Sequence, residues 1–431
     1  MVFRRRLIYL LLHMKREDTS PIGAEQAAML DRIDPARMLD RTLEWSSVNT
    51  GTGNLDGLAR QAQLLADCFG QLPGEVQLED PATVSAIDAA GEEIALERGK
   101  HLVLSVRPDA PQRVLLTGHM DTVFPSDHPF QSIRELEPGV LNGPGLADMK
   151  GGIAVIAEAL MAFESSSMAA SLGYDVMINS DEEVGSQSSA PLIERLAAGK
   201  LAALTYEPAT MPDGTMAGAR GGSGNYSVIF TGKSAHAGRN PQDGRNAIVA
   251  ASDLVLRLKA MQNDELPINP AKIEGGSANN VVPDHAVLRF NIRPKSREVA
   301  QQFEAALPAL LAEIAAQHEV QTHLHGAISR PPKPIDPKAA RLFALVDDSS
   351  RALGLVAARR DTGGVCDGNN IAACGVPVVD TMGVRGGSIH SPDEYLIVES
   401  LAERARLSAL VLHRLASGDL DGAAFDISEN R

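Results

Sequence analysis

The chain has 431 residues, of which 44% are hydrophobic and 22% are charged, and this composition is that of a globular rather than a disordered protein. Its formal net charge of -15 would repel nucleic acid and anionic lipid, so we expect neither as a partner. The length exceeds what one hydrophobic core usually reaches, which predicts two domains. Three scattered cysteines do not make a disulfide framework, and they favour a reducing, cytoplasmic location.

The first residues resemble the start of a signal peptide without completing one. Arg4, Arg5 and Arg6 precede an apolar run at 7–12, but such a segment needs roughly 7–15 apolar residues. Charged residues at 15–18 stand where a cleavage site would need small ones. We therefore predict a disordered leader over residues 1–29, with export as the less favoured alternative to the cytoplasm. No stretch reaches the roughly 20 apolar residues of a membrane span, so no membrane partner is expected.

Between residues 110 and 210, short β-rich runs alternate with helical patterns, as they do in parallel sheets flanked by helices. The predicted elements are a strand at 114–117, a helix at 150–163, and strands at 174–179 and 201–206. They indicate an α/β domain with a mostly parallel sheet, whose first part covers residues 30–217. In such sheets ligands bind beyond the carboxyl ends of the strands.

From residue 218 the pattern changes to a β-α-β-β-α-β order, which is typical of a ferredoxin-like α+β domain. Its predicted elements are a strand at 225–231, a helix at 246–261, strands at 272–274 and 286–293, a helix at 296–318 and a strand at 319–325. We predict that residues 218–328 form an inserted small domain. Clustered prolines at 331–334 mark the return to the larger domain. Its second part covers 329–416, with helices at 338–353 and 401–416 and a strand at 376–380, and a polar tail follows at 417–431.

The end of the first predicted strand carries a candidate metal ligand. His119 follows the apolar run 114–116, and Asp121 stands two residues later. A histidine ligand needs an acceptor on its second ring nitrogen, and Asp121 can supply one. Two polar residues after a strand are more often a solvated turn, so this interpretation depends on the other candidates.

Carboxylates follow two further predicted elements. Asp148 lies in a glycine-rich loop just before a helix, where it is either a ligand or the N-cap of that helix. Asp181, Glu182 and Glu183 directly follow the strand 174–179, and a metal would relieve the repulsion between these like charges. One of the two glutamates can then bind the metal while its neighbour stays free to take a proton from water.

Two more candidates complete the set. Glu207 follows the strand 201–206, and His390 stands among turn residues, where a structural hydrogen bond is the alternative. The sequence thus offers two histidines and three carboxylates as ligands, with one spare and one orienting carboxylate, as in a two-metal hydrolytic site. Imidazole and carboxylate ligands without thiolate suit Zn2+, two per chain, with Co2+ or Mn2+ as possible substitutes.

The motifs around these residues resemble those of the M20 family of dinuclear zinc metallopeptidases, in the acetylornithine deacetylase and succinyl-diaminopimelate desuccinylase superfamily. The likeness is closest to the glutamate carboxypeptidase branch and covers roughly residues 40–416. The stretches that carry it are HMDTV at 119–123, GPG at 143–145, DMKGG at 148–152, DEE at 181–183, EP at 207–208, GKSAHAG at 232–238, and His390.

This resemblance implies how the ligands share two zinc ions. Asp148 would bridge the ions, one of which is also held by His119 and Glu207 and the other by Glu183 and His390. The peptide bond after Asp148 would be cis. Asp121 would orient His119.

The resemblance also implies roles for residues outside this cluster. Glu182 would be the general base and acid. The small domain would form a homodimer and send His236 into the partner's site to stabilise an oxyanion. Asn280 and Arg293 match substrate-contacting positions, and Arg293 would bind a carboxylate through its planar fork of donors. For Arg293 an ordinary surface ion pair is the alternative.

The stretch 362–369, which contains Gly363 and Gly364, resembles the substrate-side loop of the family. Two departures concern specificity for a C-terminal glutamate. Thr215 and Met216 stand near the place where glutamate-specific relatives carry a lysine, and Asp361 stands where they carry an arginine.

We therefore expect a cytoplasmic, homodimeric zinc hydrolase that cleaves a peptide or N-acyl amide bond next to a free carboxylate of a small-molecule substrate. An N-acyl-amino-acid deacylase or a desuccinylase of the same family is the alternative, because it would share every metal ligand and differ in the pocket. A catalytically silent member that binds a ligand in the same cleft is an alternative of another class, although neither a ligand nor Glu182 is missing.

Overall fold

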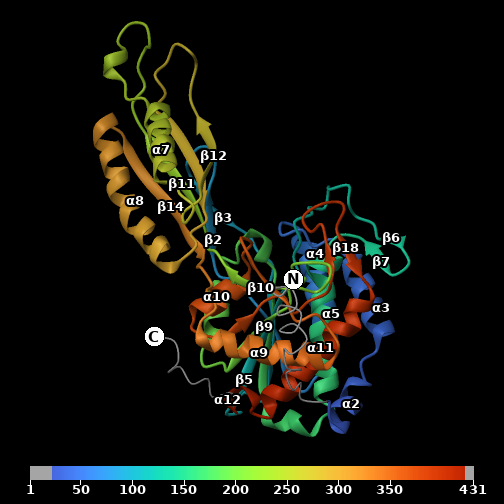
Figure 1. Ribbon diagram of the computed structural model, residues 1–431. Helices are drawn as coiled ribbons and strands as arrows, with labels where there is room; N and C mark the ends of the chain where they lie inside the picture. The colour runs from blue at the N-terminus through green and yellow to red at the C-terminus, as the bar shows by residue number, and fades with distance from the viewer. Residues whose placement is uncertain (1–21, 423–431) are drawn as a thin grey trace, which may run out of the picture.

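The computed structural model describes residues 22–422, so residues 1–21 of the predicted leader and 423–431 of the predicted tail lie outside the described residues. Figure 1 shows a larger domain from which a smaller, elongated domain projects. The leader prediction is wrong from Ala24 onward, because helix α2 (Ala24–Leu30) begins there and buries Met29 and Leu30 in the core of the larger domain. Within residues 22–422, no helix is long and apolar enough to cross a membrane.

The larger domain is built on a six-stranded sheet with the order β1-β4-β8-β5-β9-β16. Neighbouring strands run parallel among β8 (Gly173–Asn179), β5 (Arg113–His119), β9 (Ala202–Thr205) and β16 (Val378–Val379). The strands β4 (His101–Val106) and β1 (Glu75–Glu79) pair antiparallel at one side. The predicted mostly parallel α/β sheet is confirmed. In its register His119 lies opposite Asn179, so β5 and β8 end at the same edge.

Helices cover both faces of this sheet, because apolar side chains of β5 point alternately to its two faces and each face needs a covering layer. Val114 and Leu116 join the main core, whereas Leu115 joins the core on the other face. The main core also takes side chains from α3 (Pro35–Ser46), α4 (Leu55–Phe69), α5 (Gly151–Phe163), α9 (Pro337–Ala352) and α11 (Glu399–Ala416). The other core takes them from α6 (Ala190–Ala197) and α10 (Asp367–Ala373), and α12 (Asp419–Gly422) follows α11.

Smaller elements bring distant segments to the edge where the strands end. A four-stranded sheet has the order β17-β18-β7-β6, so the late strands β17 (Gly386–Gly387) and β18 (Tyr395–Ile397) lie beside β7 (Val140–Asn142) and β6 (Arg134–Glu137). Strand β10 (Met216–Arg220) pairs parallel with β15 (Arg359–Thr362). The short helical turns are η1 (Leu146–Lys150), η2 (Ser167–Ser171), η3 (Glu182–Val184) and η4 (Pro241–Asp243).

The small domain has the predicted β-α-β-β-α-β order. Its elements are β11 (Ser223–Thr231), α7 (Ala247–Met261), β12 (Ile268–Gly275), β13 (His285–Ile292), α8 (Arg297–His318) and β14 (Gln321–Arg330). The sheet is antiparallel with the order β12-β13-β11-β14, and α7 and α8 pack on one face around side chains such as Phe230, Leu288 and Phe303. The ferredoxin-like prediction is confirmed, and β14 runs five residues past its predicted end at 325, to Arg330.

A hairpin of the larger domain lies against the face of this small sheet that the helices leave open. It consists of β2 (Val84–Ile87) and β3 (Glu93–Leu96). Ile87 forms a small buried cluster with Ile229 of β11 and Val287 of β13. Arg289 donates from Nη2 to the backbone oxygen of Asp88 at 3.0 Å. Sequence reasoning did not predict this link between the domains.

Candidate metal centre

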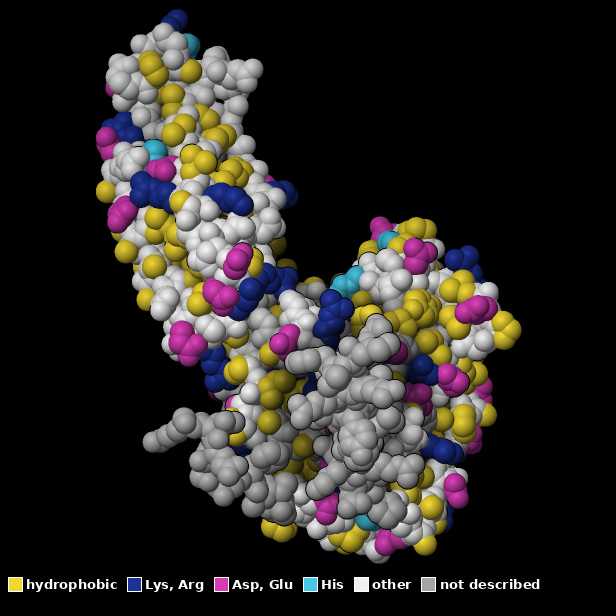
Figure 2. All heavy atoms as spheres, in the orientation of Figure 1, with side chains coloured by type: hydrophobic (Ala, Val, Ile, Leu, Met, Phe, Trp, Pro, Cys, Tyr) yellow, Lys and Arg dark blue, Asp and Glu magenta, His cyan; other side chains and the backbone are white. Residues whose placement is uncertain are grey.

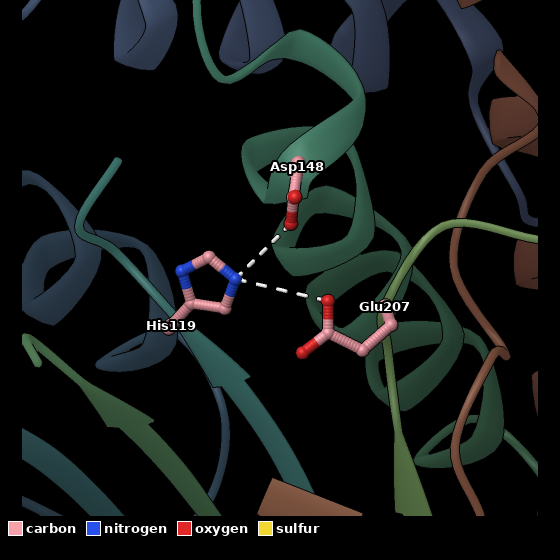
Figure 3. A group of neighbouring side chains, drawn as sticks. All are labelled: His119, Asp148 and Glu207. Atoms are coloured by element: carbon pink, nitrogen blue, oxygen red, sulfur yellow. Dashed lines mark hydrogen bonds and ion pairs between the residues drawn. The ribbon is translucent and has the colours of Figure 1, made fainter. Parts of the chain in front are cut away.

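His119 stands at the carboxyl end of β5, next to the side chains that follow the neighbouring strands. Its ring is 1% exposed because the strand is buried on both faces. Nε2 lies 3.2 Å from Asp148 Oδ1 and 3.8 Å from Oε2 of Glu207, which comes two residues after the end of β9. Figure 3 shows these three side chains pointing toward one another.

Asp148 faces a second group with its other carboxylate oxygen. His390 Nε2 lies 3.3 Å from Asp148 Oδ2 and 3.1 Å from Oε2 of Glu183, which belongs to η3 just after β8. The five predicted ligands therefore come together as two triads that share Asp148, namely His119, Asp148 and Glu207, and Asp148, Glu183 and His390. The Asp148–Met149 peptide bond is cis, as the sequence resemblance implied.

The charges of this cluster strongly perturb its protonation. Burial opposes the charged form of His119, but contacts with Asp121, Asp148 and Glu207 outweigh burial and raise the pKa of His119 well above its usual value. Hydrogen bonds to Asp148 and Glu183 raise the pKa of His390 to about 11. For Asp148, hydrogen bonds from His119 and His390 overcome burial and lower its pKa.

The remaining carboxylates respond mainly to burial. Burial, reinforced by the charge of Asp148, raises the pKa of Glu183 to about 7. Burial likewise raises the pKa of Glu207. A buried group of acids that binds extra protons in this way is one that a multivalent cation would stabilise in their place.

The donors also fit a metal by their chemistry. Glu207 Oε1 is buried and has no hydrogen-bond partner within residues 22–422, although a buried carboxylate oxygen normally has one. A cation beside the triad of His119, Asp148 and Glu207 would satisfy that oxygen. Two imidazoles and three carboxylates without a thiolate are a donor set that suits zinc.

Asp121 contacts both His119 and the loop that carries two acids. The nearest acceptor to His119 Nδ1 is the backbone oxygen of Asp121 at 3.0 Å, and the carboxylate oxygen Oδ1 lies farther away at 3.4 Å. The Asp121 carboxylate accepts from the backbone N–H groups of Glu182 and Glu183, each at 3.2 Å, and from the Thr52 hydroxyl at 2.8 Å. Asp121 therefore orients His119 chiefly through its backbone, and its side chain holds η3 in place.

Glu394, which sequence reasoning missed, holds the loop that carries Asp148. Its side chain is 1% exposed, and its carboxylate accepts from the backbone N–H groups of Gly145, Ala147 and Asp148 at 3.2, 3.0 and 3.1 Å. The loop thus turns around one buried carboxylate. In the sequence, Glu394 is marked only by its position four residues after His390. That spacing does not distinguish Glu394 from the exposed neighbour Asp393.

Glu182 lies in the same cavity as Asp148, Glu183, Glu207 and His390, and this cavity has a volume of about 770 Å3. Figure 2 shows that the molecular surface is hollowed between the small and the larger domain. Burial raises the pKa of Glu182 well above its usual value, although the positive charge of Arg330 opposes this. Its Oε1 accepts a hydrogen bond from Arg330 Nη2 at 2.7 Å. Sequence reasoning missed Arg330.

The candidate substrate residues divide into two groups. Arg293 and Gly364 line the cavity, and so does Arg220, another residue that sequence reasoning missed. Arg220 is held by Asp380, with Nε to Oδ2 at 2.7 Å, and its Nη1 donates to the backbone oxygen of Gly364 at 3.0 Å.

Three other candidates do not line this cavity, and these are His236, Asn280 and Gly363. His236 is exposed on the loop between β11 and α7, and Ala237 donates from its backbone to the backbone oxygen of Asn280. Figure 1 shows that the β11–α7 loop lies at the end of the small domain remote from the larger domain. His236 and Asn280 are therefore close to each other and far from the ligand triads of their own chain.

Residues 115–414 match the peptidase family M20/M25/M40. Carboxypeptidase G2 from Pseudomonas sp. (strain RS-16) is 30% identical over 382 residues, which cover 86% of this chain and 88% of that protein. A succinyl-diaminopimelate desuccinylase from Xanthomonas oryzae pv. oryzae is 28% identical over 355 residues, with 77% and 91% covered. A solved tripeptidase from Staphylococcus aureus shares the fold at a TM-score of 0.69 and 24% identity, covering 90% of this chain and 100% of that one. The chain therefore belongs to the M20/M25/M40 peptidase family and is a hydrolase of the metallopeptidase and amidohydrolase type.

Proposed function

We propose that this hydrolase holds two zinc ions and cleaves a peptide or N-acyl amide bond next to a free carboxylate. The observation that carries the proposal is the pair of ligand triads that share Asp148, with Glu182 in the same cavity. The relatives named a carboxypeptidase and a desuccinylase support this class of reaction.

Each triad would hold one ion, and Asp148 would face both. His119 and Glu207 would complete one site, and Glu183 and His390 the other. Co2+ or Mn2+ are chemically possible substitutes. Such cations polarise a carbonyl group and lower the pKa of water toward neutrality.

Glu182 would act as the general base and then as the general acid. It would take a proton from the water that adds to the carbonyl carbon, and it would deliver that proton to the nitrogen as the C–N bond breaks. Its raised pKa supports this role, because a carboxylate of ordinary pKa is a weak proton acceptor near neutral pH. Asp121 would keep η3, and with it Glu182, in position.

His236 would act on the partner chain of a homodimer. It is exposed and remote from the triads of its own chain, so a role in catalysis requires a second copy that presents it to the cavity. There it would donate a hydrogen bond to the oxyanion of the tetrahedral intermediate. Asn280, on the adjacent loop, would reach the same substrate.

The free carboxylate of a small-molecule substrate would bind at the cavity wall that Arg293 and Arg220 line. Arg293 is exposed there, so its planar fork is accessible to a carboxylate. Gly363 and Gly364 would form the loop beside the substrate.

Cys68, Cys366 and Cys374 are all free thiols, which supports a reducing, cytoplasmic location.

The test combines metal analysis with one conservative variant. Protein purified without chelator should contain about two zinc ions per chain, and Glu182→Gln should lose turnover while it keeps them. Glu194→Gln makes the same chemical change on the exposed surface of α6 and should behave as wild type. Normal activity of Glu182→Gln, or activity that survives complete metal removal, would refute the proposal.

An N-acyl-amino-acid deacylase or a desuccinylase is the second candidate, and the desuccinylase relative favours it because the match covers 91% of that protein. Dipeptides and N-acyl or N-succinyl amino acids, assayed side by side for released amine, would separate the two activities. Binding of these compounds without turnover of any, in zinc-loaded protein, would instead favour a ligand-binding role.

A further inference from the structure

Arg330 reaches from the small domain into the larger one and contacts Glu182. It is the last residue of β14, and its side chain is 2% exposed. From Nη2 it donates to Glu182 Oε1 at 2.7 Å and to the Ser186 hydroxyl at 2.8 Å. From Nη1 it donates to Asp367 Oδ1 at 2.6 Å and to Asn370 Oδ1 at 2.9 Å. Both ends of the guanidinium are thus used at the same time.

The direction of this guanidinium is set by groups other than Glu182. Asp367 is 1% exposed, and it accepts from the Asn179 amide at the end of β8 and from the Ser186 hydroxyl at 2.6 Å. Asp367 therefore has a fixed place beside the central sheet, and it binds one arm of Arg330. The other arm then points at Glu182.

Glu182 needs such a contact because, within residues 22–422, Arg330 is the only side chain that donates a hydrogen bond to its carboxylate. Its backbone is tied to Asp121, but three further bonds separate the carboxylate from the backbone, and neighbouring acids of the cavity repel it. A buried guanidinium offsets that repulsion and holds the carboxylate by a charge-assisted hydrogen bond.

We propose that Arg330 is a positioning residue that grips Glu182 by Oε1 and so presents Oε2 to the water and to the leaving nitrogen. This inference rests on the proposed role of Glu182 as the general base. Arg330 itself would neither accept a proton nor bind a metal. Within residues 22–422, its side-chain hydrogen bonds go to Glu182, Ser186, Asp367 and Asn370, and none goes to a proposed metal ligand.

The first test is the steady-state kinetics of Arg330→Met and Arg330→Lys. We expect Arg330→Met to lower kcat by about 100-fold, the scale of a 1 Å misplacement, with KM and zinc content unchanged. Arg330→Lys should recover part of kcat, because an ammonium has the charge but not the fork that reaches Glu182 and Asp367 together. Arg404→Met removes a side chain that is also 2% exposed, and it should affect stability without this loss of kcat.

The second test shows whether Arg330 acts through Glu182. In a Glu182→Asp background the shortened carboxylate no longer reaches the guanidinium, so adding Arg330→Met should cost far less than the same change in the wild type. If Arg330→Met does not fold, Asp367→Asn, which weakens the anchor, should lower kcat in the same direction.

Three outcomes would overturn the inference, and they are an unchanged kcat, a rise in KM alone, and equal effects of Arg330→Met in both backgrounds. The rise in KM would instead make Arg330 a substrate contact. These results leave the proposed function intact, because that proposal fails only when Glu182→Gln stays active or the protein works without metal.

Discussion

Replacing Glu394 by glutamine should loosen the loop that carries Asp148 and weaken metal binding. The carboxylate accepts from three backbone N–H groups, with Oε1 facing Ala147 and Asp148 and Oε2 facing Gly145. Glutamine keeps one acceptor oxygen and turns an NH2 group toward the N–H of Gly145. That exchange removes one hydrogen bond and leaves a buried donor unpaired, at a cost of about 1–3 kcal/mol. Because Asp148 belongs to both triads, zinc affinity should fall by about 10- to 100-fold.

Two assays distinguish the effect of Glu394→Gln on the stability of the metal-free protein from its effect on zinc affinity. Urea unfolding in the presence of EDTA, followed by the fluorescence of Trp45, gives the loss of stability without metal, since this residue is the single tryptophan and is 1% exposed in the core. Zinc titration against a competing chelator gives the affinity. Asp393→Asn makes the same carboxylate-to-amide change at the exposed neighbour and should change neither quantity. A Glu394→Gln variant with wild-type stability and zinc affinity would refute the reasoning.

Two further predictions concern the metals and the dimer. Chelation should abolish activity, and zinc at 1,000 times its Kd should stabilise the apoprotein by about 4 kcal/mol, visible as a higher Tm, whereas an unchanged Tm would contradict the metal site. Equimolar mixing of the separately inactive variants Glu182→Gln and His236→Ala, with subunit exchange, should restore about a quarter of wild-type activity, because each mixed dimer has one intact site. No recovery, although subunits exchange, would place His236 outside the partner's site.

Much of the fold could be predicted because the central strands are short apolar runs with clear ends. Strand β5 and helix α5 fall within a few residues of their predicted bounds, and all predicted elements of the small domain are present. β14 is longer than expected because its residues before Arg330 are all half-buried or exposed, so no buried apolar run marks where the strand ends. The small sheet that contains β17 and β18 was not predicted, since strands of two or three residues have no readable period.

The residues of the site likewise divide into those that the sequence marks and those that it does not. His119, Asp148, Glu183, Glu207 and His390 could be predicted because strand ends and family motifs mark them, and the structure brings them together. The side chains that hold the site could not be predicted in this way. Glu394 and Arg330 act by contacting segments more than 140 residues away in the sequence, and neither has a neighbour or spacing that distinguishes it from surface charge.

The contact of the β2–β3 hairpin with the small sheet has a mechanical consequence. The chain crosses between the domains at β11 and β14, and two such crossings alone would let the small domain swing like an arm on a hinge. The hairpin restrains this rotation. If the small domain rotates away while the hairpin stays in place, the contacts of Ile229 and Val287 with Ile87 break, and exposure of the Ile87 side chain costs about 1.5–3 kcal/mol. Otherwise the hairpin has to move together with the small domain. The small domain is therefore harder to rotate away from the hairpin than it would be if only the two chain connections held it.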